Sequence, residues 1–273
     1  MRGGEREQRR GEEGVMSSEI AVVRVSGDGG GVVDESVRRA VKSALEKLHF
    51  KLSRNAEVLV KPNIATAKVG GGVTTHPAVL DGVLAFLSEK GFKNVCVAES
   101  SWKGCPTEKA FNAYKLREIC KKYDYDAINL ENTAYDVRKG IRIFRKVLES
   151  DFIINVPVLK EHRIAKVSLG MKNMKGCIPD IEKVRFHISG LHEHIFKLNR
   201  TITPNLTVMD AILGLKGGPF SGKVFKVGLI FASYDVVALD CFACSLLGVP
   251  VERVKHIRRA VEEGLGSQKY ELV

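Results

Sequence analysis

The stretch EVLVKPNI, residues 57–64, places an apolar strand directly before a polar cluster. The same arrangement returns after VCVA, after FIINVPVL and after LTVM. In open α/β sheets, ligands bind beyond the carboxyl ends of the strands. Four clusters of this kind therefore predict one shared site at that edge of a sheet. The polar residues that follow the four runs are Lys61 and Asn63, Glu99 and Ser100, Lys160 and His162, and Asp210.

Outward from these runs, short strands alternate with helices of 10–15 residues, which is typical of an α/β fold. Strands are expected at residues 20–25, 57–60, 94–98, 127–130, 141–144, 152–156, 206–209 and 224–231, and helices at 34–48, 77–90, 108–122, 189–198, 235–247 and 251–263. We expect a mainly parallel, Rossmann-like sheet with helices on both faces. Residues 158–188 are rich in polar residues and glycine, and we expect them to form a long loop over the carboxyl edge of the strands.

Composition narrows the class of protein. The chain has 273 residues, 43 Lys and Arg against 32 Asp and Glu, a net charge of +11, and 44% hydrophobic residues. A chain of this length buries enough surface to fold without disulfides. No apolar run reaches the roughly 18 residues of a membrane span, so we expect no membrane partner. We also see no secretory signal, and with six cysteines expected to be reduced we expect a cytoplasmic protein.

The first residues differ from the rest of the chain. They contain almost no apolar side chains and balance four arginines against four glutamates. Such a segment cannot bury enough surface to become ordered. We therefore expect a disordered arm over residues 1–17 and a single α/β domain over 18–273. Met16 is an alternative start of the chain.

The segment SLGMKNMKGCIP, residues 168–179, suggests what the site binds. Lysine and asparagine donors beside glycines suit an anionic group, because glycine lets backbone N–H groups approach closely. A solvated basic loop is the alternative. The residues expected to bind the ligand are Lys61, Asn63, Thr74, Thr75, Ser100, Lys160, Lys172, Asn173 and Lys175. The acid/base candidates are Glu99, His162, His187 and Asp210, of which His162 is favoured because imidazole titrates near neutral pH.

Several cofactor signatures are incomplete. GGPFSGKV, residues 217–224, lacks the Ser or Thr of a P-loop and precedes a strand. SGDGGGVV, residues 26–33, lacks the third glycine of a dinucleotide fingerprint and stays as an alternative. Cys241 and Cys244 lie in an apolar helix, where packing is expected rather than a metal site. We therefore expect no metal ligands and leave the cofactor unknown.

The ordered blocks VLVKPNI, VTTHPAVL, VAESS, DFIINVPVLKEH, GMKNMKGCIP, VMDAILGLKGGPFSG and SYDVVALD, with His187 between them, resemble the domain of unknown function 362 family. The resemblance covers residues 18–250. It implies an α/β fold and a prokaryotic protein, because the family occurs mainly in bacteria and archaea. Some members carry an added ferredoxin-like domain, but this sequence lacks those cysteines, so an iron–sulfur cofactor is not implied here.

A more remote resemblance is to nickel-pincer enzymes of the lactate racemase type. TTHPAVL, the cluster after VCVA, and Lys160 with His162 are similar in order to that family. The sequence shows no clear counterpart of the family's Arg-containing motif or its paired histidines. A nickel-pincer cofactor is therefore not carried over to this chain.

Two functions from different classes follow. The first is an enzyme or cofactor-handling protein that binds an anionic, phosphate- or carboxylate-bearing small molecule. The alternative is a non-catalytic electron-transfer partner or scaffold that docks a separate iron–sulfur protein, which an exposed apolar patch near Cys241 would favour. Binding to nucleic acid is disfavoured, because aromatic residues are few and the basic residues are dispersed.

Overall fold

The computed structural model describes residues 18–25 and 33–273. The expected disordered arm, residues 1–17, and most of the glycine-rich alternative at 26–33 lie outside the described residues. In the described part of the chain, none of the helices combines the length and the apolar character needed to cross a bilayer.

A central sheet of ten strands organises the described part of the chain. Across its main path the strands are β12 (Tyr270–Leu272), β1 (Ser18–Arg24), β11 (Lys223–Ser233), β10 (Leu206–Lys216), β7 (Phe152–Val156), β2 (Val58–Pro62), β3 (Val95–Glu99) and β4 (Asp126–Asn129). From β10 to β4 all neighbours are parallel, whereas β11 is antiparallel to both β10 and β1. The mostly parallel sheet that the sequence predicts is confirmed.

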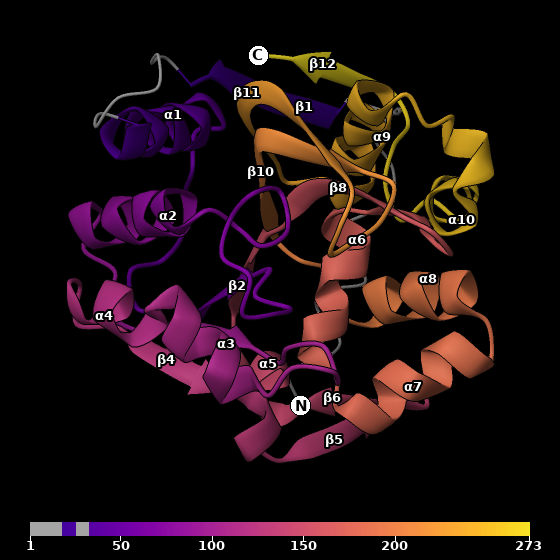
Figure 1. The fold of residues 1–273 in the computed structure, drawn as a ribbon. Helices are drawn as coiled ribbons and strands as arrows, with labels where there is room; N and C mark the ends of the chain where they lie inside the picture. The colour runs from indigo at the N-terminus through magenta and orange to yellow at the C-terminus, as the bar shows by residue number, and fades with distance from the viewer. Residues whose placement is uncertain (1–17, 26–32) are drawn as a thin grey trace.

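The sheet is buried on both faces because its inner strands are apolar on both sides. On β2, Val58 and Val60 join one hydrophobic cluster while Leu59 joins the other, as expected for a strand in a covered parallel sheet. One face is covered by α1 (Val33–Lys47), α2 (Pro77–Glu89), α3 (Thr107–Tyr114) and α4 (Leu116–Lys121). The other is covered by α5 (Arg145–Glu149), α6 (Gly170–Asn173), α7 (Asp180–Ile188), α8 (Leu191–Thr201), α9 (Val236–Leu247) and α10 (Lys255–Glu262). Figure 1 shows α1 and α2 at the left of the strands and α8 to α10 at the right.

The segment 158–188 differs from the expected long loop. It forms β8 (Val158–His162), β9 (Lys166–Ser168), α6, a 3₁₀ turn η2 (Met174–Cys177) and α7. The strand β8 pairs parallel with β10 and antiparallel with β9. The prediction of a loop was based on the polar residues and glycines of this segment. The apolar residues between them form buried contacts, which stabilise helices and strands here. Met171, Met174 and Phe186 are all fully buried.

Smaller differences occur elsewhere. The helix expected at 108–122 is two helices, since Lys115 adopts a left-handed conformation with φ 57° between α3 and α4. The helix expected at 251–263 begins as a 3₁₀ turn η3 (Val251–Arg253) before α10. The hairpin of β5 (Tyr135–Arg138) and β6 (Ile141–Phe144) forms a separate small sheet. The sequence predicted β6 but neither β5 nor β12.

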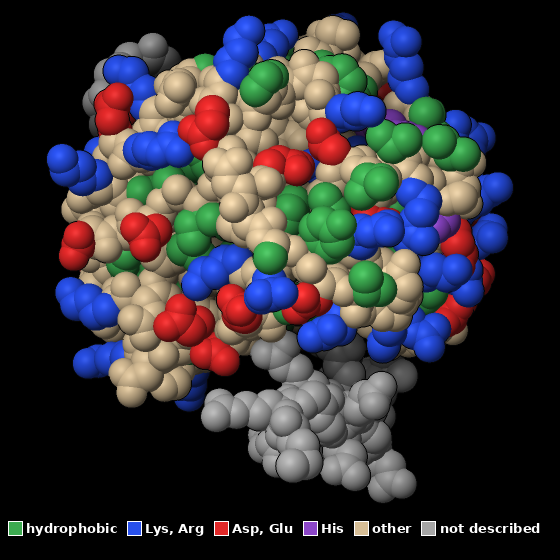
Figure 2. All heavy atoms as spheres, turned by 90° about the horizontal axis from the view of Figure 1, so that it is seen from below, with side chains coloured by type: hydrophobic (Ala, Val, Ile, Leu, Met, Phe, Trp, Pro, Cys, Tyr) green, Lys and Arg blue, Asp and Glu red, His purple; other side chains and the backbone are tan. Residues whose placement is uncertain are grey.

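Surface charge is mixed rather than segregated on the face shown in Figure 2. Lys and Arg side chains are spread across it, Asp and Glu lie between them, and hydrophobic side chains gather near its centre. The net charge of +11 therefore does not form a single basic stripe on that face.

Candidate functional site

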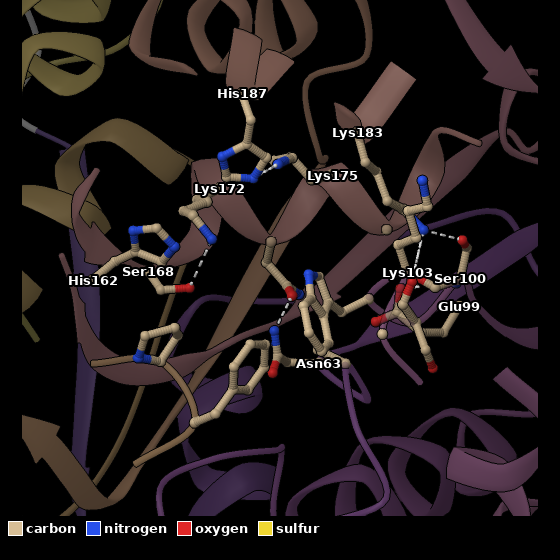
Figure 3. A pocket seen from close by; sticks show the side chains of 18 of the residues that line it. Asn63, Glu99, Ser100, Lys103, His162, Ser168, Lys172, Lys175, Lys183 and His187 are labelled. Atoms are coloured by element: carbon tan, nitrogen blue, oxygen red, sulfur yellow. Dashed lines mark hydrogen bonds between the residues drawn. The ribbon is translucent and has the colours of Figure 1, made fainter. Parts of the chain in front are cut away.

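A pocket of about 560 Å³ opens beyond the carboxyl ends of β2 and β3. Its walls come from the loops after these strands, from β8, from α6 through α7, and from the turn between β10 and β11 (Figure 3). The lining residues are Lys61, Asn63, Ala65, Glu99, Ser100, Ser101, Trp102, Lys103, Gly104, His162, Ser168, Lys172, Asn173, Lys175, Gly176, Lys183, Val184, His187, Ile188, Pro219 and Phe220. This volume is typical of small-molecule sites.

Nine of the thirteen residues singled out in the sequence line this pocket: Lys61, Asn63, Glu99, Ser100, His162, Lys172, Asn173, Lys175 and His187. The other four, Thr74, Thr75, Lys160 and Asp210, are buried but do not line the pocket. They belong to the layer of hydrogen bonds that supports its walls.

The supporting layer fixes the loop after β2. The Thr75 hydroxyl donates to the Val156 carbonyl at 2.7 Å and accepts from the Asn63 N–H at 2.8 Å. Thr74 accepts the Gly70 N–H and donates to the Lys68 carbonyl.

Asp210 supports the next part of the same loop. Its carboxylate accepts the His76 N–H at 2.7 Å and the Ile212 N–H at 3.2 Å. Burial raises the pKa of this carboxyl above its usual value, although the two N–H donors oppose the rise. Its acceptor capacity is thus used within the fold, which gives it a positioning role.

Three asparagines connect the strands beneath the pocket. The Asn63 amide donates to the Asn173 side-chain oxygen at 2.7 Å, and Asn173 donates to the Asn155 side chain at 2.8 Å. Lys160 reaches this network from β8, where its Nζ donates to the Asn63 side-chain oxygen at 3.0 Å and to the Val73 carbonyl at 2.5 Å. Burial, with the charges of Lys172 and Lys61, lowers the pKa of Lys160 to about 7. The network locks α6 against β2 and β7.

Lys61 and Glu99 form a buried ion pair at the base of the pocket. Their side chains are 1% and 2% exposed, and Nζ lies 2.9 Å from Oε2. Glu99 also accepts the N–H groups of Ile64 and Ser100, at 3.2 and 2.9 Å. Gly176 covers the pair so closely that a Cβ at that position would lie 1.8 Å from the Glu99 Oε1. The Lys61 charge is therefore matched by the fold itself.

Lys183 of α7 is also matched. Its Nζ donates to the Ser101 carbonyl at 2.7 Å and contacts the Ser100 hydroxyl. It forms ion pairs with Glu131 at 3.2 Å and Asp180 at 3.1 Å. The amino group thus ties α7 to the loop after β3, and its charge is met by two carboxylates.

Lys172 and Lys175 differ from Lys61 and Lys183 in the partners of their amino groups. In the part of the chain that the structure describes, no ion pair joins either of them to an Asp or Glu. Lys172 lies 3.5 Å from the Ser168 hydroxyl, and the Lys175 Nζ lies 3.0 Å from the His187 Nε2. Burial and the Lys61 charge lower the pKa of Lys172 to about 8. Burial and the charges of Lys172 and Lys183 lower that of Lys175 to about 6. These amines are the unmatched cations of the pocket.

Two histidines accompany them (Figure 3). The His162 Nδ1 accepts the N–H groups of Ile164 and Ala165, at 3.2 and 3.1 Å. Its proton is therefore assigned to Nε2, which stays available as a donor. Burial and the neighbouring lysines hold the pKa of His162 far below its usual value. Burial, Lys175 and Lys172 likewise lower that of His187 to about 4.

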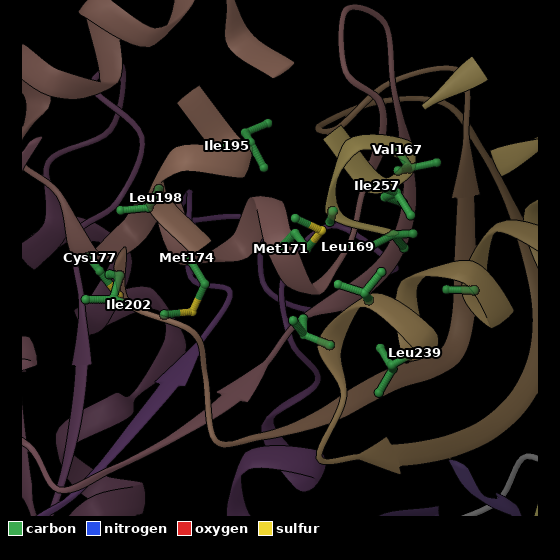
Figure 4. Packing of buried hydrophobic residues seen from close by; sticks show 14 of the residues in the cluster. Val167, Leu169, Met171, Met174, Cys177, Ile195, Leu198, Ile202, Leu239 and Ile257 are labelled. Carbon is green, nitrogen blue, oxygen red and sulfur yellow. The ribbon is translucent and has the colours of Figure 1, made fainter. Parts of the chain in front are cut away.

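The basic segment is held in place by an apolar underside. Met171, Met174 and Cys177 face away from the pocket into the core, where they lie among Ile195, Leu198 and Ile202 (Figure 4). Asp240 of α9 accepts the N–H groups of Gly170 and Met171, at 2.7 and 2.9 Å. The placement of Lys172 and Lys175 thus originates in the burial of Met171, Met174 and Cys177, which lie before, between and after them.

Sequence reasoning did not single out several pocket residues, notably Trp102, Lys103, Lys183 and Phe220. Trp102 and Lys103 directly follow the predicted cluster at Glu99, so a wider window there includes them. Lys183 and Phe220 come from segments whose approach depends on tertiary packing. Across residues 18–25 and 33–273, no three His, Cys, Asp or Glu side chains are arranged to hold a metal ion.

Comparisons with known proteins agree with this fold. A curated "thylakoid-associated protein" from Synechocystis sp. is 28% identical over 221 residues, which cover 77% of this chain and 68% of that protein. Among solved structures, the lactate racemase apoprotein from Thermoanaerobacterium thermosaccharolyticum is similar, with a TM-score of 0.51 and 12% identity. That similarity covers 84% of this chain but only 56% of the racemase chain, and it shows a shared fold alone. The sequence pattern of the family described as "Domain of unknown function (DUF362)" matches residues 58–245, more than half of the chain, and the protein therefore belongs to the DUF362 family.

Proposed function

We propose that the pocket binds an anionic small molecule that carries a phosphate or carboxylate group, and that the protein is an enzyme or a cofactor-handling protein acting on it. One observation carries the proposal: Lys172 and Lys175 both line the pocket, and among residues 18–25 and 33–273 neither is paired with a carboxylate. The His162 Nε2 is a further donor in the same pocket, and the Asn63 and Asn173 side chains line it although their amides also bond within the fold. Arrangements of lysine and amide donors suit anions.

The electrostatics support the same conclusion. Burial and the Lys61 charge lower the pKa of Lys172, and burial with the charges of Lys172 and Lys183 lowers that of Lys175, so each amine is destabilised when it carries a proton. A bound anion reverses that effect, because it favours the protonated form of each amine. Lys103 is exposed at the rim, where water screens its charge, and Lys61 and Lys183 are already paired. The anion is therefore best placed against Lys172 and Lys175 rather than against Lys61.

The four acid/base candidates differ in how well they are placed to exchange a proton with a bound ligand. Glu99 is committed to Lys61 and to two N–H donors, and Asp210 lies behind the wall. The His162 Nε2–H can donate to a ligand but cannot accept a proton from it. His187 is exposed at the pocket and contacts Lys175, so it is the group best placed to exchange a proton with a bound ligand.

Thermal unfolding with inorganic phosphate tests the proposal. Phosphate should raise the melting temperature by several degrees, because a ligand at 100 times its Kd stabilises the folded state by about 2.7 kcal/mol. The Lys172→Met, Lys175→Met double variant should lose the increase. Lys121→Met, an exposed lysine on α4 outside the pocket, should keep it. Equal increases in both variants, or an increase reproduced by sodium chloride at matched ionic strength, would refute the proposal.

Docking of an iron–sulfur protein has less support. That alternative expects an exposed apolar patch near Cys241. Cys241 and Cys244 are instead 3% and 0% exposed within α9, where they belong to the hydrophobic core. The pocket, with its two unmatched lysines, favours a small ligand over a docked protein.

A further inference from the structure

The rim of the pocket carries two aromatic rings from segments far apart in sequence. Trp102 lies in the loop after β3, and Phe220 lies in the turn between β10 and β11. Their ring centroids are 5.2 Å apart with planes inclined at 42°. Trp102 is the chain's single tryptophan and is 51% exposed. Neither ring takes part in the anion site described above.

Trp102 is held in place by neighbouring groups. The backbone N–H of Trp102 donates to the Ala65 carbonyl at 3.0 Å, and its backbone carbonyl accepts the Cys105 N–H at 2.8 Å, so the main chain that carries the ring is fixed on both sides. Gly104 lies directly against the ring, since a Cβ there would be 1.8 Å from an indole carbon. The ring is thus supported by Gly104 and by Phe220 while half of its surface stays in contact with solvent. A large exposed ring held in this way is available for stacking.

Other apolar side chains line the same pocket. They are Pro219, Val184 and Ile188, of which Ile188 is 81% exposed. Exposed apolar side chains that gather at one place often mark a binding site. An inorganic anion would bind to the lysines and leave these aromatic and apolar side chains in contact with water. The pocket therefore has a cationic part and an aromatic part, and a ligand that fills both must combine a charge with a ring.

We propose that the ligand carries a planar aromatic ring that stacks on Trp102, joined to the phosphate or carboxylate group that Lys172 and Lys175 bind. This inference rests on the proposed anion-binding function and narrows its substrate class. Stacking on an aromatic side chain tolerates different rings, because every planar ring presents a π-face. The contacts of Lys172 and Lys175 with the anionic group then fix the position of the ligand in the pocket.

Tryptophan fluorescence tests the proposal directly, since the signal of the intact chain comes from Trp102 alone. The probes are matched pairs: phenyl phosphate against inorganic phosphate, and adenosine 5′-monophosphate against ribose 5-phosphate. The ring-bearing member of each pair should change the emission of Trp102 and bind about tenfold tighter or more. Equal affinities within both pairs would overturn this inference while leaving the anion site intact. Failure of all four probes to bind would instead refute the proposed function, and this inference with it.

Variants separate stacking from a general effect on folding. Calorimetric titration with phenyl phosphate and with adenosine 5′-monophosphate should show about tenfold weaker binding in Trp102→Ala, near wild-type binding in Trp102→Phe, and no change for inorganic phosphate in either. Tyr135→Ala removes an exposed ring outside the pocket and should bind as the wild type does. A Trp102→Ala protein that binds ring-bearing probes as tightly as the wild type would contradict the proposal.

Discussion

Two buried lysines that line the pocket, Lys61 on β2 and Lys183 on α7, have carboxylate partners. Lys61 is paired with Glu99, and Lys183 reaches across to Glu131 and Asp180. On α6 and η2, Lys172 contacts the Ser168 hydroxyl, and Lys175 contacts the His187 imidazole and the Phe186 ring, but in the described residues neither lysine is paired with a carboxylate. The same residue type thus serves two purposes in one pocket: the paired lysines, Lys61 and Lys183, hold the walls together, and the unpaired lysines, Lys172 and Lys175, with which no carboxylate is paired in the described residues, face the cavity.

The contrast between paired and unpaired lysines predicts which of them contribute to the stability of the fold and which to ligand binding. Removing one member of a buried ion pair leaves the other charge without compensation, which destabilises the folded state strongly. Removing a lysine that is already desolvated and repelled by its neighbours relieves the fold instead. A paired lysine should therefore matter for folding, and an unpaired lysine for ligands.

The largest expected effect concerns a paired lysine. Lys61→Met should lower the free energy of unfolding by about 3–5 kcal/mol, because Glu99 would be left charged and buried. Lys172→Met, the matched change at an unpaired lysine, should alter it by less than about 1 kcal/mol or raise it. Urea denaturation of the two variants measures the difference. Comparable losses of unfolding free energy in the two variants would contradict the distinction between paired and unpaired lysines.

A smaller effect concerns pH. The lowered pKa of Lys175, about 6, means that the folded chain binds fewer protons at this group than the unfolded chain between about pH 6 and pH 10. The free energy of unfolding should therefore rise with pH across that window. In Lys175→Met the rise should be shallower, with the remainder due to Lys172 and Lys160, whose pKa values are also lowered. Denaturation midpoints from pH 6 to pH 9 measure the slope, and identical slopes in both proteins would show that Lys175 is solvated.

Much of this arrangement was predictable from the sequence for a physical reason. Parallel strands present their carboxyl ends at one edge, so polar residues following apolar runs can be expected to meet, and Lys61, Glu99 and His162 do line one pocket. The pairing of Lys61 with Glu99 could not be predicted, because it depends on the relative rotation of two neighbouring strands. The helices within 158–188 were hidden because their apolar contacts come from α8 and α9, which follow later in the chain.

The positions of Thr74, Thr75 and Asp210 mark another limit. Their residue types suit ligand binding, and they lie close to the predicted clusters. Their side chains are nevertheless hydrogen-bonded to backbone groups of the loop after β2, of β7 and of β10, which only the folded geometry reveals. The contribution of Phe220 depends likewise on the β10–β11 turn reaching over the pocket.

The most direct test of the central claim is the location of a bound anion. Crystals of the protein soaked in tungstate, a heavy tetrahedral analogue of phosphate, would show the anion by its anomalous scattering. The account predicts a peak within hydrogen-bonding distance of the Nζ atoms of both Lys172 and Lys175, with the Lys61–Glu99 pair intact. A pocket without tungstate beside ordered peaks elsewhere on the surface, or tungstate bound to Lys61 in place of Glu99, would contradict it.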